Sequence, residues 1–271
     1  MSGPAVRNQR SRQMLTFGLT LVRHGETQCN KEGRLQGQAI DSPLSETGLR
    51  QAEAAGRYLK EVKFSHVFAS DMLRARQTAE AIMQLNSSCS GLHLTADSLL
   101  KEKNFGVAEG GRVQEFKDMA KAAGKSFMDF TPPQGETQEQ VKERVKRFLE
   151  KTLQRIGAER WNGGEPDDTS APASPEAPPA EGRAGDGVED TALHALVITH
   201  GVYMYVAVRY FMEELVCGPP RGCEPALWRS LSPNAGMSRF RVSVRKDGER
   251  FVLSGICCVF LHRRDHLKDL H

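Results

Sequence analysis

The chain has 271 residues, of which 39% are hydrophobic and 26% charged, a balance typical of a globular protein with one large or two small domains. The formal net charge is +3, and no apolar run approaches the roughly 20 residues that a membrane helix needs. No dense Lys/Arg stripe with interleaved aromatic residues occurs either. Composition therefore excludes an integral membrane protein and argues against a nucleic-acid partner.

The first thirteen residues hold three arginines and no acidic residue, and they lack the apolar core of a secretory signal. We interpret residues 1–13 as a disordered arm, or as a segment added before a natural start at Met14, and residues 14–271 as one domain. The six cysteines form no CxxC pair and no Cys/His cluster with zinc-ligand spacing. We therefore expect a reducing compartment, the cytoplasm, and no bound metal.

Beyond Met14, short apolar runs alternate with helical stretches. The predicted strands are Thr16–Val22, His66–Ser70, Leu193–Thr199, Met237–Val244 and Phe251–Phe260, the last two forming a hairpin. The predicted helices are Ser45–Lys60 with Ser45 near the N-cap, Asp71–Leu85 opened by Ser70 or Asp71, Thr137–Ile156 with a Thr137/Gln140 capping box, and Gly201–Leu215. This alternation predicts an α/β fold, a three-layer α/β/α sandwich with a mostly parallel central sheet.

Residues 160–190 differ from the rest of the chain. They hold eight acidic residues against two arginines, a net charge of −6 that leaves +9 for the remainder. Five prolines, five glycines and few large apolar side chains cannot bury enough surface to offset the ordering entropy. We predict a disordered insertion within the domain at about 160–190, and a basic body that suits a small anionic partner.

Two predicted strands end in the same way, one at His24-Gly25 and the other at His200-Gly201. Ligands of open parallel sheets bind at the carboxyl ends of the strands, so neighbouring strands would bring both imidazoles to one crevice. The glycine after each histidine lets the backbone turn away and a ligand approach closely. A single strand-end histidine is usually structural, but two in matching contexts favour a shared site.

The residues near these histidines suit phosphoryl chemistry. A neutral imidazole can attack a phosphoryl centre and form a phosphohistidine. The phosphoryl oxygens then need fixed donors, and the planar guanidinium of Arg23, beside His24, fits them. Arg74, in the first turn of the helix after the second strand, would project to the same edge. A lone arginine there is usually a solvated charge, and only the strand-end context favours the functional interpretation.

These motifs resemble the signature of the histidine phosphatase (phosphoglycerate mutase-like) superfamily. The resemblance rests on blocks that occur in the family's order: Leu21–Thr27, Pro43–Gly48, Ser70–Ala79, Leu100–Gly110 and Thr199–Gly201. It implies that His24 is the phosphorylated nucleophile and that Arg23, Arg74 and His200 hold the phosphoryl group. Asn30, Gln36, Gly37 and Gly201 would line the phosphate pocket, and no metal or organic cofactor is implied.

The resemblance also implies that Glu102 protonates the leaving oxygen and later activates water. We expect burial beside a phosphate to favour the protonated carboxyl. Two alternatives stay open: Glu102 as a surface partner of a neighbouring lysine, and Glu109 as the acid.

Three further stretches, Asn30–Gln38, Val62–His66 and Phe130–Thr137, are similar to superfamily members that remove the C2 phosphate of fructose 2,6-bisphosphate. This implies a phosphatase acting on that ester and on 2,3-bisphosphoglycerate, which lowers glycolytic flux. It also allows the nucleus or the mitochondrial surface as locations beside the cytoplasm. The alternatives are mutase-type phosphoryl transfer, a broad-specificity metabolite phosphatase, a protein phosphatase, and a scaffold with a dead site. We expect a monomer.

Overall fold

A single six-stranded sheet forms the centre of the computed structural model, which describes residues 14–162, 182–220 and 223–270. The strands lie in the order β3-β2-β4-β1-β5-β6. Pairs β3/β2, β2/β4 and β4/β1 are parallel, whereas β5 and β6 are antiparallel additions at one edge. The strands are β1 (Met14–Arg23), β2 (His66–Ala69), β3 (Leu94–Ala96), β4 (His194–Thr199), β5 (Met237–Asp247) and β6 (Arg250–Arg263).

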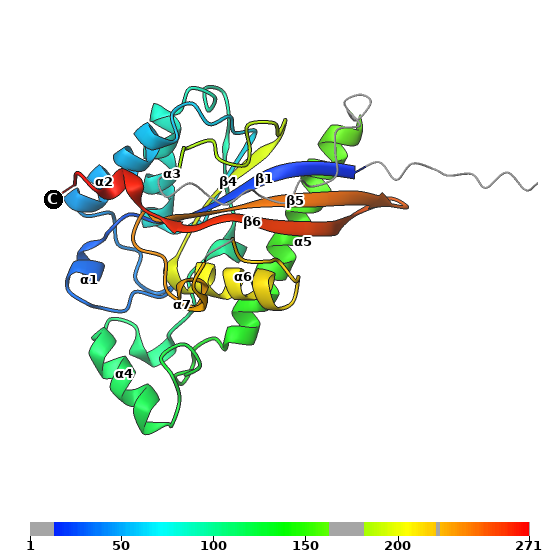
Figure 1. The fold of residues 1–271 in the computed structure, drawn as a ribbon. Coiled ribbons are helices and arrows are strands. Elements are labelled where there is room, and N and C mark those ends of the chain that lie inside the picture. Colours follow the sequence, from blue (N-terminus) through cyan, green and yellow to red (C-terminus); the bar gives the residue numbers. More distant parts are fainter. Residues whose placement is uncertain (1–13, 163–181, 221–222, 271) are drawn as a thin grey trace, which may run out of the picture.

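Helices cover both faces of the sheet, which confirms the predicted α/β/α sandwich (Figure 1). Helices α2 (Glu46–Tyr58) and α3 (Leu73–Leu85) pack on one face, and α5 (Gln138–Asn162) and α6 (Gly201–Glu213) on the other. The remaining helices are α1 (Gln28–Lys31), α4 (Val113–Ala122) and α7 (Pro225–Trp228), with short 3-10 turns at Ser98–Leu100, Gly106–Ala108 and Asp265–Leu267. Figure 1 shows α4 as a lobe that projects away from the sandwich.

Strand β4 shows why the sheet is buried on both faces. Ala195 and Val197 belong to the core under α5 and α6, whereas Leu196 and Ile198 belong to the core under α2 and α3. All four are fully buried. Successive side chains of a strand point to opposite faces, so a continuous apolar run is what a two-sided central strand requires.

Two of the predicted helix starts are confirmed. The Ser45 side chain accepts a hydrogen bond from the amide of Gly48 at the start of α2. At α5 the Gln140 amide donates to Thr137 Oγ1 (3.1 Å) and the Thr137 amide donates to Gln140 Oε1 (2.8 Å), which is the predicted capping box. These caps satisfy amides that have no partner within the helix.

Most predicted boundaries differ from the observed ones by a few residues, and β3 was not predicted. Two of the differences have a clear physical cause. Helix α3 begins at Leu73, and neither Ser70 nor Asp71 caps it: the Leu73 amide donates to Asp41 Oδ1 (2.7 Å) from a distant loop. Helix α5 continues to Asn162 and does not end at Ile156. Its extra turns carry Trp161, whose ring lies 5.1 Å from that of Phe251, so packing on the hairpin extends the helix.

The predicted disordered insertion was drawn too wide at both ends. Residues 160–162 belong to α5, and residues 182–190 are described and packed. Arg239 Nη1 donates to the carbonyls of Ala184 (2.6 Å) and Asp186 (3.1 Å), and Val188 is buried. Residues 163–181 and the predicted arm at 1–13 lie outside the described residues. One domain with an insertion remains our prediction.

Within the described ranges, no helix combines the length and apolar character needed to cross a bilayer. The longest, α5, carries charged residues along its whole length. Among the same residues, no group of three or more His, Cys, Asp or Glu side chains is arranged to hold a metal ion.

Candidate active site

The ends of β1 and β4 bring the two predicted histidines together. The strands are parallel neighbours in which Arg23 pairs with Thr199, so His24 and His200 follow at the same sheet edge. Their ring centroids lie 5.1 Å apart with the planes inclined at 60°. Both imidazoles are therefore within reach of one phosphate-sized group.

The tautomer of His24 follows from the hydrogen bond that its ring makes with the main chain. Nδ1 lies 2.7 Å from the carbonyl oxygen of Gly25, which only accepts, so Nδ1 carries the proton and Nε2 holds a lone pair. Burial, followed by the charges of Arg74 and Arg23, holds the pKa of His24 well below its usual value of 6.5. Near pH 7 the ring is therefore neutral, the form that an attacking imidazole requires.

His200 is fully buried, and neither of its ring nitrogens has a partner among the described residues. Burial and the nearby charge of Arg74 hold its pKa well below the usual range. A buried polar atom without a partner costs free energy, so such atoms point to a ligand. The rings of His24 and His200 mark where a polar ligand would satisfy them.

Two arginines flank these rings. Arg23 Nη1 donates to the carbonyl of Ser232 (2.7 Å). Arg74 donates through Nη1 to the carbonyl of Ile40 (3.1 Å) and through Nη2 to that of Gly37 (2.9 Å). The Nε atoms of Arg23 and Arg74 are buried without partners among the described residues. Each guanidinium is thus fixed by main-chain carbonyls and keeps a donor for an anion.

Glu102 reaches the same place from the loop before α4. Its carboxylate accepts from the amides of Lys103 (2.8 Å), Tyr203 (3.0 Å) and Val202 (3.1 Å), the last two in the first turn of α6. The positive end of the helix dipole favours a negative group there. Glu102 is 9% exposed, so the surface-partner alternative is wrong.

Glu109, the rival acid, has a different position. Its carboxylate accepts from the amides of Gln38 (3.0 Å), Ala39 (2.6 Å) and Phe105 (2.9 Å). It therefore supports the loop beneath Gly37 from outside. Of the two acids, only Glu102 lines the cavity that contains His24.

The remaining predicted residues complete one wall. Asn30 Oδ1 accepts from the Thr27 amide (3.1 Å), and Gln36 Oε1 accepts from Ser42 Oγ (2.6 Å), which leaves each side-chain nitrogen for a ligand. Gly37 has a positive φ of 55°, and a Cβ there would collide with the Glu109 carboxylate. At Gly201 a Cβ would lie 3.2 Å from the Arg23 guanidinium carbon.

These side chains enclose a cavity of about 140 Å³. Every predicted site residue lines it except His200, whose ring centroid lies 5.1 Å from that of His24. The other lining residues, which sequence reasoning did not single out, are Arg34, Leu35, Phe105, Val113, Phe127, Val202 and Leu231.

The sequence profile of the histidine phosphatase superfamily (branch 1) matches residues 19–161, more than half of the chain. The chain belongs to this superfamily. Among curated relatives, the probable fructose-2,6-bisphosphatase TIGAR A of Danio rerio is 54% identical over 94% of this chain and 99% of its own length. The fructose-2,6-bisphosphatase TIGAR of Bos taurus is 40% identical, covering 92% of this chain and 96% of its own.

Solved structures of the superfamily share the fold. Phosphoglycerate mutase from Bacillus anthracis superposes with a TM-score of 0.62 over 91% of this chain and 95% of its own, at 23% identity. The predicted phosphoglycerate mutase-like architecture is therefore confirmed. At this identity the likeness speaks for the fold alone.

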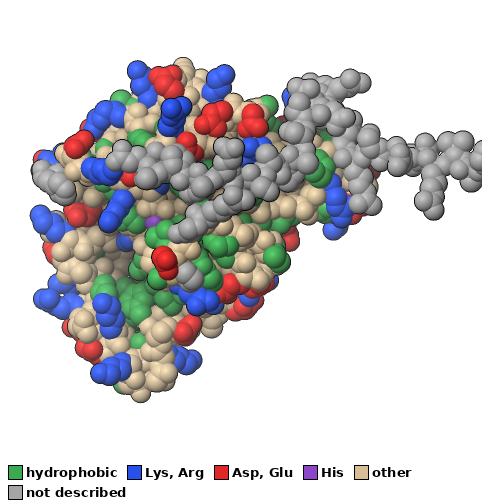
Figure 2. All heavy atoms as spheres, viewed as in Figure 1, with side chains coloured by type: hydrophobic (Ala, Val, Ile, Leu, Met, Phe, Trp, Pro, Cys, Tyr) green, Lys and Arg blue, Asp and Glu red, His purple; other side chains and the backbone are tan. Residues whose placement is uncertain are grey.

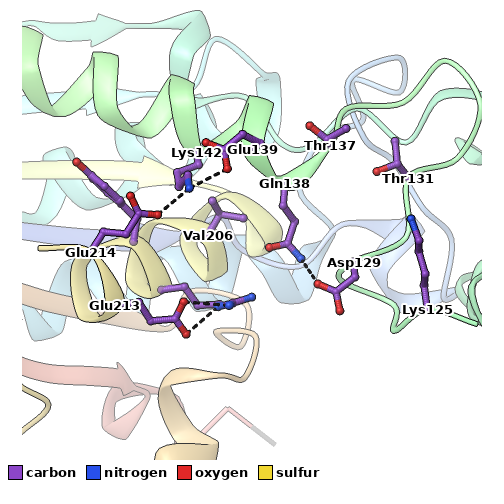
Figure 3. Close-up of a pocket in the computed structure, with 12 residues that line it drawn as sticks. Lys125, Asp129, Thr131, Thr137, Gln138, Glu139, Lys142, Val206, Glu213 and Glu214 are labelled. Atoms are coloured by element: carbon purple, nitrogen blue, oxygen red, sulfur yellow. Dashed lines mark hydrogen bonds and ion pairs between the residues drawn. The ribbon is translucent and has the colours of Figure 1, made fainter. Parts of the chain in front are cut away.

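A wider hollow of about 480 Å³ lies between α6, the start of α5 and the 125–131 segment (Figure 3). Five of its seven charged side chains pair with one another. Lys142 Nζ lies 2.7 Å from both Glu139 and Glu214, and Arg209 Nη2 lies 2.9 Å from Glu213. The Nε donors of Arg23 and Arg74, which have no partner among the described residues, belong to side chains that line the smaller cavity at His24.

The sequence held a signal for one missed residue. Arg34 lies inside the Asn30–Gln38 stretch that carried the family resemblance, between two predicted pocket residues. Its Nη1 donates to the carbonyl of Gly110 (2.9 Å) and its Nε to Glu32 (3.1 Å). It is the third arginine on the cavity wall, and about 46% of its side chain is exposed.

Proposed function

We propose that this protein is a phosphatase that hydrolyses the C2 phosphate of fructose 2,6-bisphosphate through a phosphohistidine on His24. The observation that carries the proposal is the neutral, buried imidazole of His24 with a free Nε2, set among the unsatisfied donors of Arg23, Arg74 and His200. Relatives of that name match more than nine-tenths of the chain.

In the first step, the lone pair of His24 Nε2 attacks the phosphorus and a P–N bond forms. The bond from phosphorus to the sugar oxygen breaks, and that oxygen takes the proton of the Glu102 carboxyl. Arg23, Arg74 and His200 donate to the phosphoryl oxygens, whose charge grows as the bonds exchange. Fructose 6-phosphate leaves.

In the second step, the Glu102 carboxylate takes a proton from water, and the water oxygen attacks the phosphorus. The P–N bond breaks, inorganic phosphate leaves, and His24 returns to its neutral form. Glu102 thus needs both protonation states in one cycle. Three amide donors hold its carboxylate oxygens in place for both proton transfers.

The proposal includes no metal or organic cofactor. In many phosphoryl-transfer enzymes divalent ions neutralise the phosphate charge. Here we assign that task to the guanidinium groups of Arg23 and Arg74 and to the imidazole of His200. A phosphatase activity that is lost on treatment with a chelator and restored by a divalent ion would contradict this assignment.

The charge of the cavity supports a substrate with more than one anionic group. Three arginines line it, and two of them suffice for the transferred group, so Arg34 is available for a second anionic group. We therefore place 2,3-bisphosphoglycerate beside fructose 2,6-bisphosphate as a substrate. Removal of the sugar bisphosphate would lower glycolytic flux. We further propose a monomer acting in the cytoplasm, with the nucleus or the mitochondrial surface as further sites.

On the face drawn in Figure 2, Lys and Arg side chains are interspersed with acidic ones and form no continuous stripe. Proteins that follow a nucleic-acid backbone carry such a stripe, so this face supports a small metabolite as the partner.

The test is a comparison of substrates with the full-length protein. Fructose 2,6-bisphosphate, 2,3-bisphosphoglycerate and a phosphopeptide are each incubated with wild type and with His24→Ala, and released phosphate and organic product are measured. We expect fructose 6-phosphate and phosphate in equal amounts, and no turnover by the variant. Near-wild-type turnover by His24→Ala would refute the mechanism. Transfer of the phosphoryl group back onto an organic acceptor would establish the mutase alternative.

A further inference from the structure

The guanidinium of Arg144, on α5, contacts the main chain that carries Glu102. Nη1 donates to the carbonyls of Leu99 and Lys101, both at 2.8 Å, and Nη2 donates to the carbonyl of Glu102 at 3.2 Å. One side chain thus binds three carbonyls within four residues of chain that has no regular structure after the Ser98–Leu100 turn.

Glu136 occupies the other edge of the same guanidinium. Arg144 Nε donates to Glu136 Oε1 (2.9 Å) and Nη2 donates to Oε2 (2.8 Å), a two-bonded pair. A guanidinium has five N–H donors, and these five contacts use all of them. The side chains of Arg144 and Glu136 are 15% and 20% exposed, so water screens the pair only partly.

The same pair also lies near the carboxylate end of Glu102 and near the loop that contains Gly37. The Arg144 guanidinium lies 5.7 Å from the ring centre of Tyr203, whose amide holds Glu102 Oε1. Gln38, next to Gly37, donates through Nε2 to the Glu102 carbonyl (2.7 Å) and to Glu136 Oε2 (3.2 Å). Arg144 itself does not line the cavity, so it acts on Glu102 from behind.

We propose that Arg144 is a positioning residue, paired with Glu136, that fixes Glu102 in the geometry needed for proton transfer to the leaving oxygen. The inference rests on the proposed function, because it assigns Glu102 the acid role. Proton transfer requires a donor–acceptor distance of about 2.6–3.2 Å, and a misplacement of about 1 Å costs on the order of 10²-fold in rate. A lysine offers one nitrogen and cannot span three carbonyls and a carboxylate.

Substrates with different leaving groups distinguish a loss of Glu102 positioning from a general loss of stability. A sugar alkoxide is a poor leaving group and needs a proton as the P–O bond breaks, whereas p-nitrophenolate leaves without one. If Glu102 is misplaced, cleavage of the sugar ester should therefore slow much more than cleavage of the aryl ester. Because kcat/KM ends at the first irreversible step, it reports phosphoryl transfer and not the later water step.

The experiment compares kcat/KM for fructose 2,6-bisphosphate and p-nitrophenyl phosphate in R144M, R144K, E102Q, the double variant R144M/E102Q and wild type. R147M serves as the matched control, because Arg147 lies exposed on the same helix. We expect R144M to lose about 30- to 100-fold on the sugar ester and less than about 5-fold on the aryl ester, with R144K between R144M and wild type. In the E102Q background, R144M should add less than about 2-fold, because both changes remove one function. R147M should match wild type.

Equal losses on both esters, or losses that multiply in the double variant, would show that Arg144 only stabilises the fold and would overturn the inference. Thermal unfolding identifies a variant that does not fold, in which case R144K decides. Wild-type protein that cleaves p-nitrophenyl phosphate but not fructose 2,6-bisphosphate would refute the proposed substrate alone. In that case kcat/KM of the same variants is measured with 2,3-bisphosphoglycerate, whose leaving groups are also alkoxides. Inactivity on all three esters would refute both proposals.

Discussion

Replacing Gly37 by alanine should lower the free energy of unfolding more than the same replacement at Gly33. Both glycines have positive φ, 55° at Gly37 and 65° at Gly33, so an alanine strains the backbone at either position by about 1–2 kcal/mol. Alanine also restricts the unfolded chain more than glycine does, and this effect offsets about 0.4–1 kcal/mol of the strain. At Gly33 a Cβ meets nothing within 4 Å, so Gly33→Ala should cost about 0–1.5 kcal/mol of unfolding free energy.

At Gly37 the Cβ would also displace the Glu109 carboxylate. That carboxylate accepts from the amides of Gln38, Ala39 and Phe105. Ala39 is exposed and its amide can turn to water, but the other two amides are partly or fully shielded. Two weakened hydrogen bonds to a charged group add about 2–5 kcal/mol to the cost. The Gly37 carbonyl also holds Arg74, so phosphate binding should weaken as well.

Urea unfolding gives the free energies, and kcat/KM on fructose 2,6-bisphosphate gives the effect on the site. We expect Gly33→Ala to keep wild-type kcat/KM and Gly37→Ala to lose both stability and activity. Equal unfolding free energies for the two variants, or full activity in Gly37→Ala, would refute the reasoning that Glu109 and Gly37 form one support.

Three further outcomes follow from the structure. Glu102→Gln should lower kcat/KM on fructose 2,6-bisphosphate by about 10²–10⁴-fold and on p-nitrophenyl phosphate far less; a similar loss on both esters would contradict the acid role. Arg34→Met should raise KM for the bisphosphate by only about 10-fold, because solvent screens this half-exposed side chain, and should leave KM for the aryl monophosphate unchanged. Equal changes in KM for the two substrates would show that Arg34 takes no part in substrate recognition. Burial holds the pKa values of His24, His194 and His200 well below 6.5, so below that pH the unfolded chain binds protons that the folded protein does not. As the pH is lowered below 6.5, the free energy of unfolding should therefore decrease, by up to about 1.4 kcal/mol per pH unit for each histidine. A urea midpoint that stays constant between pH 7 and pH 5.5 would rule this out.

The sequence predicted the parts of the site that depend on strand ends. His24 and His200 each follow a continuous apolar run, and parallel pairing of β1 with β4 is enough to bring them together. Local chemistry also predicted the starts of α2 and α5, because Ser45 and Thr137 cap amides only three residues away.

Contacts between distant segments could not be predicted in this way. Asp41 supplies the cap of α3 from another loop, and no spacing in the sequence relates it to Leu73. The apolar wall of the cavity combines Phe127, just beyond α4, with Leu231, just beyond α7, so it exists only once the chain has folded. Arg239 holds residues 182–190 through the main-chain carbonyls of Ala184 and Asp186. Amino-acid composition gives no information on which main-chain carbonyls will accept such hydrogen bonds.

The order of strands across the sheet makes the two halves of the chain interdependent. The superfamily profile ends at residue 161, yet β4 lies between β2 and β1 and pairs with both. A fragment ending at residue 161 would contain His24 but would lack β4, the strand that pairs with both β1 and β2. It would also lack the Ser232 carbonyl that orients Arg23 and the Asn234 amide that donates to the carbonyl of His24. We therefore expect the sheet edge that carries His24 and His200 to form only when the last third of the polypeptide has been made.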